Sequence, residues 1–324
     1  MSAETYKIRP IISCVGGPTD RISWFLNRIV SQLLPKVSSH RSSGSQFLER
    51  VKNARFQQNC VMESHDVTYL YTNVQNKQTL QALSEMLDRH GRSIETFGLS
   101  KQCIMILMGE GQYFKWSGKY FSQIRGLAMG QRLAPFPLLL AVCFMSIIEQ
   151  PVIECHPQMY CRYIDDCFII RSTQSEMDKC FRILNEGSQY IKLTREQPKD
   201  GWLPYLNAQI RLYNGIASVK WYRKESSKNK LINAKSAHPS GMKKAIIRNM
   251  VKTATAMCTG DREREESLKL ATSIASSNGY SRLKSNIYSR TTNNTVRIPR
   301  EGRIPLCIPS VSDSLTAAIH RIPL

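Results

Sequence analysis

Acidic residues are scarce in this sequence, where 25 Asp or Glu stand against 45 Lys or Arg and leave a formal net charge of +20. Long hydrophobic runs are missing as well. The most apolar stretch lies between Arg132 and Glu149, contains two prolines and is shorter than the roughly 20 residues that a membrane helix needs. We therefore expect a buried core helix at residues 136–148 and no membrane partner. The excess of positive charge points instead to a polyanionic partner.

The sequence contains neither a disulfide framework nor a secretory signal. Its ten cysteines show no regular spacing, and residues 1–9 are polar and basic. We therefore expect free thiols in a reducing compartment and an intracellular protein, nuclear or cytoplasmic rather than secreted. A zinc site is an alternative use for Cys155, His156, Cys161 and Cys167, but their spacing does not match a compact zinc motif.

Two adjacent aspartates, Asp165 and Asp166, are the most informative feature of the chain. They follow Tyr163 and Ile164 and precede the apolar run 167–170, so residues that favour strands flank them on both sides. This pattern predicts a tight β-hairpin with two carboxylates at its tip. Such carboxylates repel each other unless cations neutralise them, and Mg²⁺ or Mn²⁺ suits carboxylate oxygens best. The hairpin therefore suggests phosphoryl transfer, although Asp-Asp pairs also occur in ordinary surface turns.

A third carboxylate, Asp66, opens a β-prone segment that continues to Val74. Nucleotide transfer by two metal ions needs carboxylates that converge from separate strands, and Asp66 can supply one of them. Tyr71 lies five residues further on, where we expect this strand to end. The alternative is an ordinary strand end in which Tyr69 and Tyr71 are packing aromatics.

Glycines and turn signals mark the other elements. In the segment 126–135, Gly126 and Gly130 allow the backbone to approach a ligand or a neighbouring strand closely. Periodicity and turn residues predict further helices at 20–34, 45–53, 76–90, 176–186, 243–253 and 261–276, a hairpin at 112–124, strands at 7–13, 205–212 and 216–222, and a short helix at 312–321.

Taken in order, four motifs resemble those of a reverse transcriptase: Arg9-Pro10-Ile11-Ile12-Ser13, the segment 66–74, the segment 126–135 and Tyr163-Ile164-Asp165-Asp166. The details are similar to the Penelope-like retroelement group. They include LYTNV after Asp66, GLAMG before the apolar helix, LPYLNAQI at 203–210 and the long basic segment 221–251. The resemblance covers roughly residues 8–320, and several motifs in order are far more specific than one.

The resemblance implies that Asp66, Asp165 and Asp166 are the catalytic residues and hold two Mg²⁺ or Mn²⁺ ions. A primer 3′-hydroxyl would attack the α-phosphate of a deoxynucleoside triphosphate on an RNA template, and pyrophosphate would leave. Tyr71 would crowd a ribose 2′-hydroxyl and so favour deoxynucleotides. The implied nucleotide contacts are Arg9, Tyr71, Gly130 and Gln131, and Tyr163 would pack near the DNA primer terminus.

Some positions depart from the family pattern. Gln131 and Arg132 stand where the family usually has Ser-Pro, and Asn207 stands where it usually has aspartate. We also expect a shortened fingers region and find no GIY-YIG nuclease motif. Two other interpretations follow: a weak or inactive remnant that only binds nucleic acid, or an RNA-copying RNA polymerase. Tyr71 disfavours the second.

Positive charge is concentrated late in the chain. Residues 220–303 hold 19 Lys or Arg and 6 Asp or Glu, with Trp221, Tyr222, Tyr280 and Tyr288 among them. Basic and aromatic residues together are typical of a surface that grips nucleic acid, while a solvated basic face is the alternative. We expect Lys243, Lys244 and Arg248, on one predicted helix, to contact the backbone of the nucleic acid.

These observations predict an α/β (α+β) fold of the right-hand polymerase type. Its palm would combine an antiparallel sheet with helices, next to reduced fingers and a basic helical thumb. A chain of 324 residues with 42% apolar content can bury such a core. The expected domains are partial fingers at 1–60, the palm at 61–215 with a fingers-side insertion at about 75–123, the thumb at 216–290 and a C-terminal connector at 291–324. The sequence does not indicate an oligomeric state.

Overall fold

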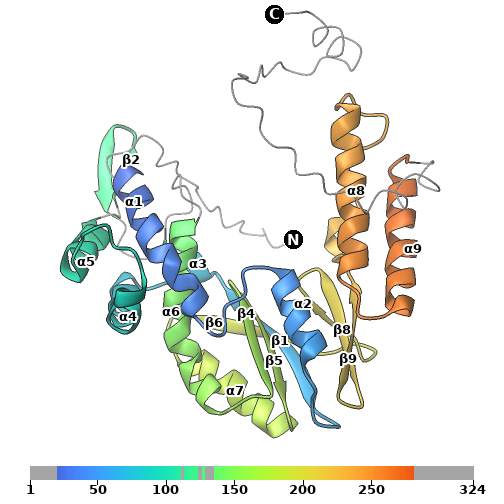
Figure 1. Ribbon diagram of the computed structural model, residues 1–324, viewed down its shortest axis with the longest axis horizontal. Helices are drawn as coiled ribbons and strands as arrows, with labels where there is room; N and C mark the ends of the chain where they lie inside the picture. Colours follow the sequence, from blue (N-terminus) through green and yellow to red (C-terminus); the bar gives the residue numbers. More distant parts are fainter. Residues whose placement is uncertain (1–19, 111–112, 123–125, 128–134, 281–324) are drawn as a thin grey trace, which may run out of the picture. The chain divides into compact units, whose positions relative to one another are not determined.

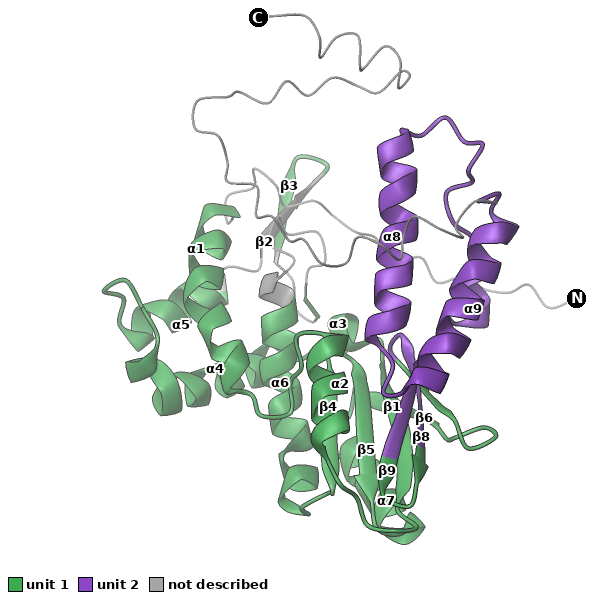
Figure 2. Ribbon diagram, turned by 45° about the vertical axis from the view of Figure 1, so that its right-hand side comes forward, with its two compact units in different colours: residues 1–205, 212–216 green, residues 206–211, 217–324 purple. Residues whose placement is uncertain are grey.

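The computed structural model describes residues 20–110, 113–122, 126–127 and 135–280 (Figure 1). The chain divides into two compact units, coloured separately in Figure 2. Unit 1 comprises residues 1–205 and 212–216, and unit 2 comprises residues 206–211 and 217–324. The boundary expected between palm and thumb, at residue 215, lies in the turn between strands β8 (Ala208–Tyr213) and β9 (Ile216–Trp221).

A four-stranded antiparallel sheet with the order β4-β5-β1-β6 forms the centre of unit 1. Its strands are β1 (Val61–Thr68), β4 (Met159–Tyr163), β5 (Asp166–Arg171) and β6 (Lys192–Glu196). Strands β4 and β5 form the predicted hairpin, with Tyr163 opposite Asp166. β5 is buried along nearly its whole length because strands pair with it on both sides and side chains cover both of its faces.

Helices cover both faces of this sheet, as the alternation of side chains along β5 requires. Cys167 and Ile169 belong to the main hydrophobic core, which also includes residues of α1 (Asp20–Val30), α4 (Asn76–His90), α6 (Pro135–Glu154) and α7 (Gln174–Glu186). Phe168 points to the other face, where its ring lies 5.0 Å from that of Phe47 on α2 (Gly44–Asn53). The two faces therefore have separate packing partners.

Helix α6 confirms the prediction of a buried core helix. Its residues 139–145 are buried, and it packs against α4, α7 and α1. Among the described residues, no helix is both long enough and apolar enough to span a membrane. Pro151 lies within the helix and Cys155 follows its end.

The remaining elements of unit 1 are short. They are the 3₁₀ helices η1 (Ser31–Lys36) and η2 (Gly91–Ser93), the single-turn helix α3 (Leu70–Asn73), α5 (Lys101–Glu110), the hairpin strands β2 (Tyr113–Trp116) and β3 (Lys119–Ser122), and β7 (Leu203–Tyr205). The helix expected at 20–34 is α-helical only to Val30 and continues as η1, which contains Pro35. Proline cannot donate the backbone hydrogen bond that an α-helix would need at that position.

Two strand predictions were wrong in their bounds. The strand that contains Asp66 begins at Val61 and ends at Thr68, so Tyr71 lies in helix α3 and not at a strand end. The strand ends at Thr68 because the next residue, Tyr69, adopts a left-handed backbone conformation with φ 54°, which changes the direction of the chain. Likewise, the strand expected at 205–212 is interrupted by Leu206, with φ 54°, and becomes the two strands β7 and β8.

Unit 2 contains most of β8, nearly all of β9, the short η3 (Glu225–Ser227) and two long helices, α8 (Ser240–Ala256) and α9 (Asp261–Ser277). The order β7-β8-β9 makes a three-stranded sheet. Hydrogen bonds join β9 to α9 and to the loop before it: Val219 N–H donates to Oγ1 of Thr259 in the loop at 2.8 Å, and Trp221 N–H donates to Ser267 Oγ on α9 at 3.1 Å. The helices expected at 243–253 and 261–276 are thus confirmed, with α8 longer than predicted by three residues at each end.

Candidate active site

The sheet register brings the three predicted carboxylates to one edge of the sheet. Asp66 on β1 lies directly opposite Asp166 on β5, and the N–H of Val67 donates to the carbonyl oxygen of Asp165 at 3.0 Å. Residues opposite each other in an antiparallel pair have Cα atoms about 4.5–5.5 Å apart, and their side chains share a face. About a hundred residues of sequence therefore separate two aspartates that are neighbours in the fold.

The turn that carries Asp165 is tight and strained. Because Tyr163 pairs with Asp166, only Ile164 and Asp165 form the loop, and Ile164 has φ 57°. A positive φ is a true outlier for a β-branched residue and persists only where neighbouring contacts enforce it. Asp165 and Asp166 are half-buried and Asp66 is exposed, so all three carboxylates border solvent.

Tyr71 belongs to the same neighbourhood. Burial raises the pKa of its hydroxyl, and the negative charge of Asp165 and the nearby Tyr163 raise it further. The segment at Gly126 holds the turn in which Tyr71 lies: Leu127 N–H donates to the carbonyl of Tyr71 at 2.6 Å, and Gly126 N–H donates to that of Val74 at 2.9 Å. The structure therefore places Tyr71, Tyr163 and Asp165 in one region. Arg9, Gly130 and Gln131 lie outside the described residues.

A buried ion pair beneath the carboxylate turn was not predicted. Arg162 Nε donates to Glu149 Oε2 at 2.7 Å, and the side chains are 0% and 1% exposed. Burial alone would lower the pKa of Arg162, but the adjacent Glu149 carboxylate raises it, so the guanidinium stays charged. In the sequence, the pair is visible only as one charged residue in each of two apolar elements, Glu149 in α6 and Arg162 in β4. Only the packing of α6 on the sheet shows that the two side chains are in contact.

A second buried carboxylate lies on β1, on the face opposite Asp66. Glu63 is fully buried and accepts hydrogen bonds from Arg195 at 2.6 and 2.9 Å, as well as from Gln174 and Gln197. Burial would raise its pKa, but these bonds and that of His65 outweigh it and lower the pKa to about 2. His65 is buried against Phe181, so it is a packed residue and not a solvent-facing acid or base.

The chemistry of the donor set fits a hard divalent cation. The carboxylates of Asp66, Asp165 and Asp166 offer oxygen ligands only, as Mg²⁺ and Mn²⁺ prefer, and their mutual repulsion favours a bound cation. Within the described ranges, however, no three His, Cys, Asp or Glu side chains are grouped closely enough to hold a metal ion. The backbone thus brings the ligands together, while the side chains do not form a closed metal cage. Burial raises the pKa of the neighbouring Cys167 thiol to about 12, which makes it a poor zinc ligand.

The predicted nucleic-acid contacts on α8 differ from one another. Lys243 is half-buried and its ammonium donates to the carbonyl of Ala234 at 2.9 Å. Lys244 and Arg248 are exposed, and so is Lys252, which the sequence analysis did not single out. These three lie four residues apart on one helix face, and within the described part of the chain none has a hydrogen-bond or ion-pair partner.

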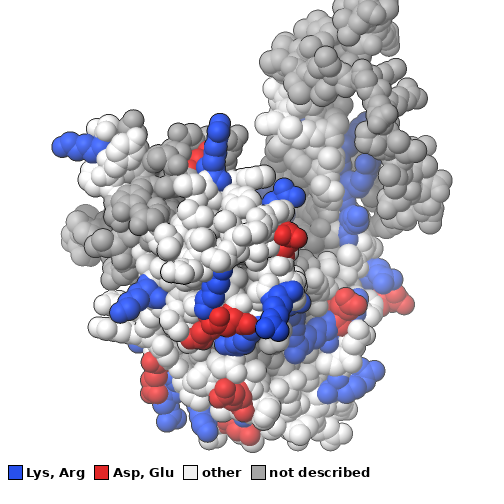
Figure 3. Space-filling view, turned by 60° about the vertical axis from the view of Figure 1, so that its left-hand side comes forward, with Lys and Arg blue, Asp and Glu red and all other residues white. Residues whose placement is uncertain are grey.

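Helix α9 shows the opposite pattern, because its basic residues are neutralised locally. Arg262 pairs with Glu266, Arg264 with Asp261 and Lys269 with Glu265, at 3.3, 3.0 and 2.8 Å. On the face drawn in Figure 3, acidic side chains likewise lie among the basic ones. The unpaired cations on α8 therefore differ from the locally paired cations of α9.

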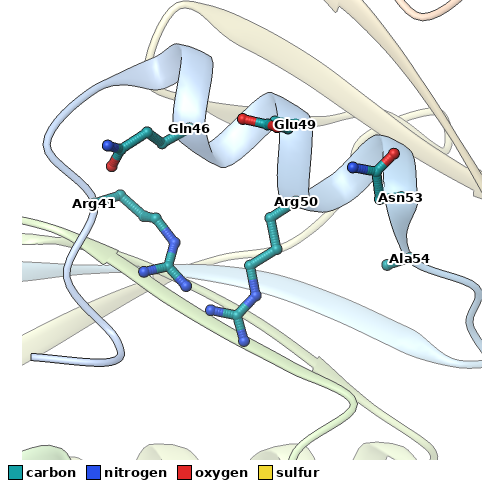
Figure 4. A pocket seen from close by; sticks show the side chains of 6 residues that line it. All are labelled: Arg41, Gln46, Glu49, Arg50, Asn53 and Ala54. Atoms are coloured by element: carbon teal, nitrogen blue, oxygen red, sulfur yellow. The ribbon is translucent and has the colours of Figure 1, made fainter.

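An open pocket lies beside α2, and none of the three aspartates lines it. Its lining residues are Arg41, Gln46, Glu49, Arg50, Asn53 and Ala54. Figure 4 shows the guanidinium groups of Arg41 and Arg50 pointing into the same space, while the carboxylate of Glu49 points away from them. Arg41 Nη1 donates to the carbonyls of Ser38 and His40, at 2.8 and 2.6 Å.

Comparison with known families gives two matches. Residues 4–199 match the model of the reverse transcriptase (RNA-dependent DNA polymerase) family, which is more than half of the chain. Residues 230–289, which include α8 and α9, match an animal helix-turn-helix domain. No curated protein sequence matches the chain significantly.

One solved structure supports the fold, and two others show a weaker similarity. Telomerase from Candida albicans in complex with the TWJ fragment of telomeric RNA aligns with a TM-score of 0.51 and 10% identity over 80% of this chain and 48% of that chain. A truncated apo telomerase from Candida tropicalis aligns with a TM-score of 0.45 and 14% identity, over 63% of this chain and 45% of that chain. The BmCPV RNA-dependent RNA polymerase aligns with a TM-score of 0.46 and 11% identity, over 81% of this chain and 24% of that chain. The chain thus spans less than half of each of these solved chains.

Proposed function

Since the chain belongs to the reverse transcriptase family, we propose that it is an RNA-directed DNA polymerase that extends a DNA primer on an RNA template. The observation that carries this proposal is the register that sets Asp66 opposite Asp166, with Asp165 at the adjoining turn. A right-hand fold with carboxylates at this sheet edge suits nucleotidyl transfer, because the reaction depends mainly on positioning and on neutralising charge.

In this proposal Asp66, Asp165 and Asp166 hold two Mg²⁺ or Mn²⁺ ions. When bound, such ions would make the primer hydroxyl a better nucleophile and would stabilise the leaving pyrophosphate. The protein's own part is to bring the three carboxylates together from two paired strands and the turn between β4 and β5. Tyr163, beside them on β4, would pack against the primer terminus.

Tyr71 sets the choice of sugar in this proposal. Its ring lies near Asp165, and the backbone hydrogen bonds from Gly126 and Leu127 fix the turn that carries it. A ring held there would crowd a 2′-hydroxyl and favour deoxynucleoside triphosphates. Arg9, Gly130 and Gln131 complete the proposed nucleotide contacts.

We further assign the chain to the Penelope-like retroelement group, with an intracellular site of action. The support is the set of sequence motifs around Asp66, Gly126 and residues 203–251. Residues 61–215 would be the palm, and residues 216–290 the thumb. The exposed cations of α8 would contact the phosphates of the primer–template duplex, with Lys243 acting mainly through its bond to the loop at Ala234.

Primer extension by the full chain on an RNA template tests the proposal. The wild type should add deoxynucleotides in Mg²⁺ or Mn²⁺, and Asp165→Asn should lower the rate by orders of magnitude. Asp88→Asn is the matched control, because Asp88 is an exposed carboxylate on α4 paired with Lys101. Nucleic-acid binding without extension would show a protein that only binds, and equal use of ribonucleotides would indicate an RNA polymerase.

A further inference from the structure

Arg162 and Glu149 form the most deeply buried arginine–carboxylate pair among the described residues of unit 1. Arg162 donates to both carboxylate oxygens of Glu149, through Nε at 2.7 Å and Nη2 at 3.2 Å. Tyr160 Oη adds a hydrogen bond to the same carboxylate at 3.2 Å, and Ser39 Oγ also donates to it. A group with this many partners has one orientation, because each bond restricts the planar guanidinium or carboxylate.

The rest of the guanidinium points at the carboxylate turn. Arg162 Nη1 donates to the carbonyl oxygen of Ile164 at 3.1 Å, and Nη2 donates to that of Val142 on α6 at 3.2 Å. Ile164 is the residue with the positive φ, and it directly precedes Asp165 and Asp166. The bond to its carbonyl therefore holds the peptide whose unusual conformation aims the two aspartates.

The backbone of Arg162 is fixed as well. Its N–H donates to the carbonyl of Ser39 and its carbonyl accepts from the N–H of Arg41, both at 2.8 Å. Arg162 thus links the turn to α6 through Glu149 and Val142, and to the segment 39–41 through its main chain. Its guanidinium lies on the α6 side of the sheet, opposite the face that carries Asp66 and Asp166.

Stability alone is a weak reason for such a pair. Two buried charges lose their hydration, and apolar residues of similar volume often stabilise a fold as well or better. We propose that Arg162 and Glu149 are positioning residues of the polymerase site: Glu149 orients Arg162, and Arg162 holds the Ile164 carbonyl so that Asp165 and Asp166 face Asp66. This inference rests on the proposed function, since it assigns these residues to the same site.

The double variant Arg162→Met with Glu149→Met tests the proposal, because it removes both charges together and leaves no buried ion unpaired. It should fold, yet it lacks the donor to Ile164. Mutation of residues that orient metal ligands typically lowers metal affinity or activity by roughly 10–100-fold. We expect a loss of that size in Mn²⁺ affinity, measured by titration without turnover, and in kcat for primer extension, with a smaller change in KM for the nucleotide.

Arg195→Met is the matched control. It breaks the pair with the buried carboxylate of Glu63, and neither Arg195 nor Glu63 bonds to the turn. The control should lose stability but keep the Mn²⁺ affinity of the wild type. Arg162→Lys should be intermediate, since lysine keeps a charge beside Glu149 but cannot form the fork that also reaches Ile164.

The outcomes separate the two proposals. A folded double variant with wild-type Mn²⁺ affinity and kcat would overturn the positioning role and leave the proposed function standing. Losses in the Arg195 variant as large as those in the double variant would also overturn it, because they would show a general effect of destabilisation. A wild type that neither binds Mn²⁺ nor extends primers would overturn the proposed function, and the positioning role with it.

Discussion

Gly126 lies so close to Tyr71 that a side chain there would collide with it: a Cβ on Gly126 would lie 2.8 Å from the carbonyl oxygen of Tyr71. Gly126 also has φ +81°, which disfavours any residue with a Cβ. Gly126→Ala should therefore destabilise unit 1 by about 2 kcal/mol and shift the turn that carries Tyr71. Urea denaturation would measure the loss.

The control for this variant is Gly98→Ala. Gly98 has a similar φ of +79°, but nothing lies within 4 Å of a Cβ built on it. The difference between the two free energies of unfolding isolates the contact with Tyr71 from the backbone strain. Equal losses at the two sites would mean that the segment at Gly126 moves freely away from Tyr71.

Tyr71→Ala should relax discrimination against ribonucleotides by roughly tenfold or more, because it removes the ring expected to crowd a 2′-hydroxyl. Tyr71→Phe should retain the discrimination, since burial and Asp165 keep the hydroxyl neutral and the ring is unchanged. Single-nucleotide addition kinetics would measure both. Tyr69→Ala, at an exposed ring in the same turn, is the control. Unchanged selectivity in an active Tyr71→Ala enzyme would show that the ring only packs.

Asp66→Asn should raise the free energy of unfolding in EDTA and reduce the stabilisation that Mg²⁺ gives. The reason is that Asp66 lies opposite Asp166, so the substitution removes a like charge from the pair and a ligand from the proposed site. Thermal unfolding with and without Mg²⁺ would measure both effects. If Mg²⁺ stabilised the variant against thermal unfolding as much as it stabilises the wild type, Asp66 would not be a ligand of the metal site.

Local patterns predicted much of this fold, since helix α4 has the predicted bounds, and the hairpin that carries Asp165 and Asp166 follows from its flanking strand formers. The left-handed residues Tyr69 and Leu206 were not predictable in this way, because tertiary contacts impose a conformation that their types disfavour. The Arg162–Glu149 pair was not predicted for a related reason: the two residues come into contact only when α6 packs on the sheet.

His40 should make the protein less stable in mild acid. Burial and the positive charges of Arg162 and Arg41 lower its pKa from 6.5 to about 4. Between those values the unfolded chain binds more protons than the folded one, so the free energy of unfolding falls as the pH decreases. Between about pH 7 and about pH 5.5 the loss should be about 1 kcal/mol.

Urea denaturation of the wild type and of His40→Gln at the two pH values would check this effect. The glutamine variant should lose the pH dependence assigned to His40, whereas Glu63, with a pKa of about 2, titrates only at more acidic pH. The same slope in both proteins would show that His40 can be protonated within the fold.

The exposed cations on α8 predict that the protein binds nucleic acid with an affinity that depends on salt concentration. Lys244, Arg248 and Lys252 are exposed and have no partner among the described residues, so each can contact a phosphate and release a counterion. Replacing all three by Gln should weaken binding to all duplex sequences alike. It should also reduce the slope of log affinity against log salt by roughly 0.9 for each phosphate that the variant no longer neutralises.

The matched control is on α9, where Arg262, Arg264 and Lys269 are each paired with an acidic residue of the same helix. Replacing these three by Gln removes the same net charge from the same unit. If α8 holds the phosphates directly, the α9 variant keeps the wild-type salt slope, because its cations are already neutralised. If net charge alone attracts the duplex, both variants lose affinity and slope equally, and α8 is then no dedicated contact surface.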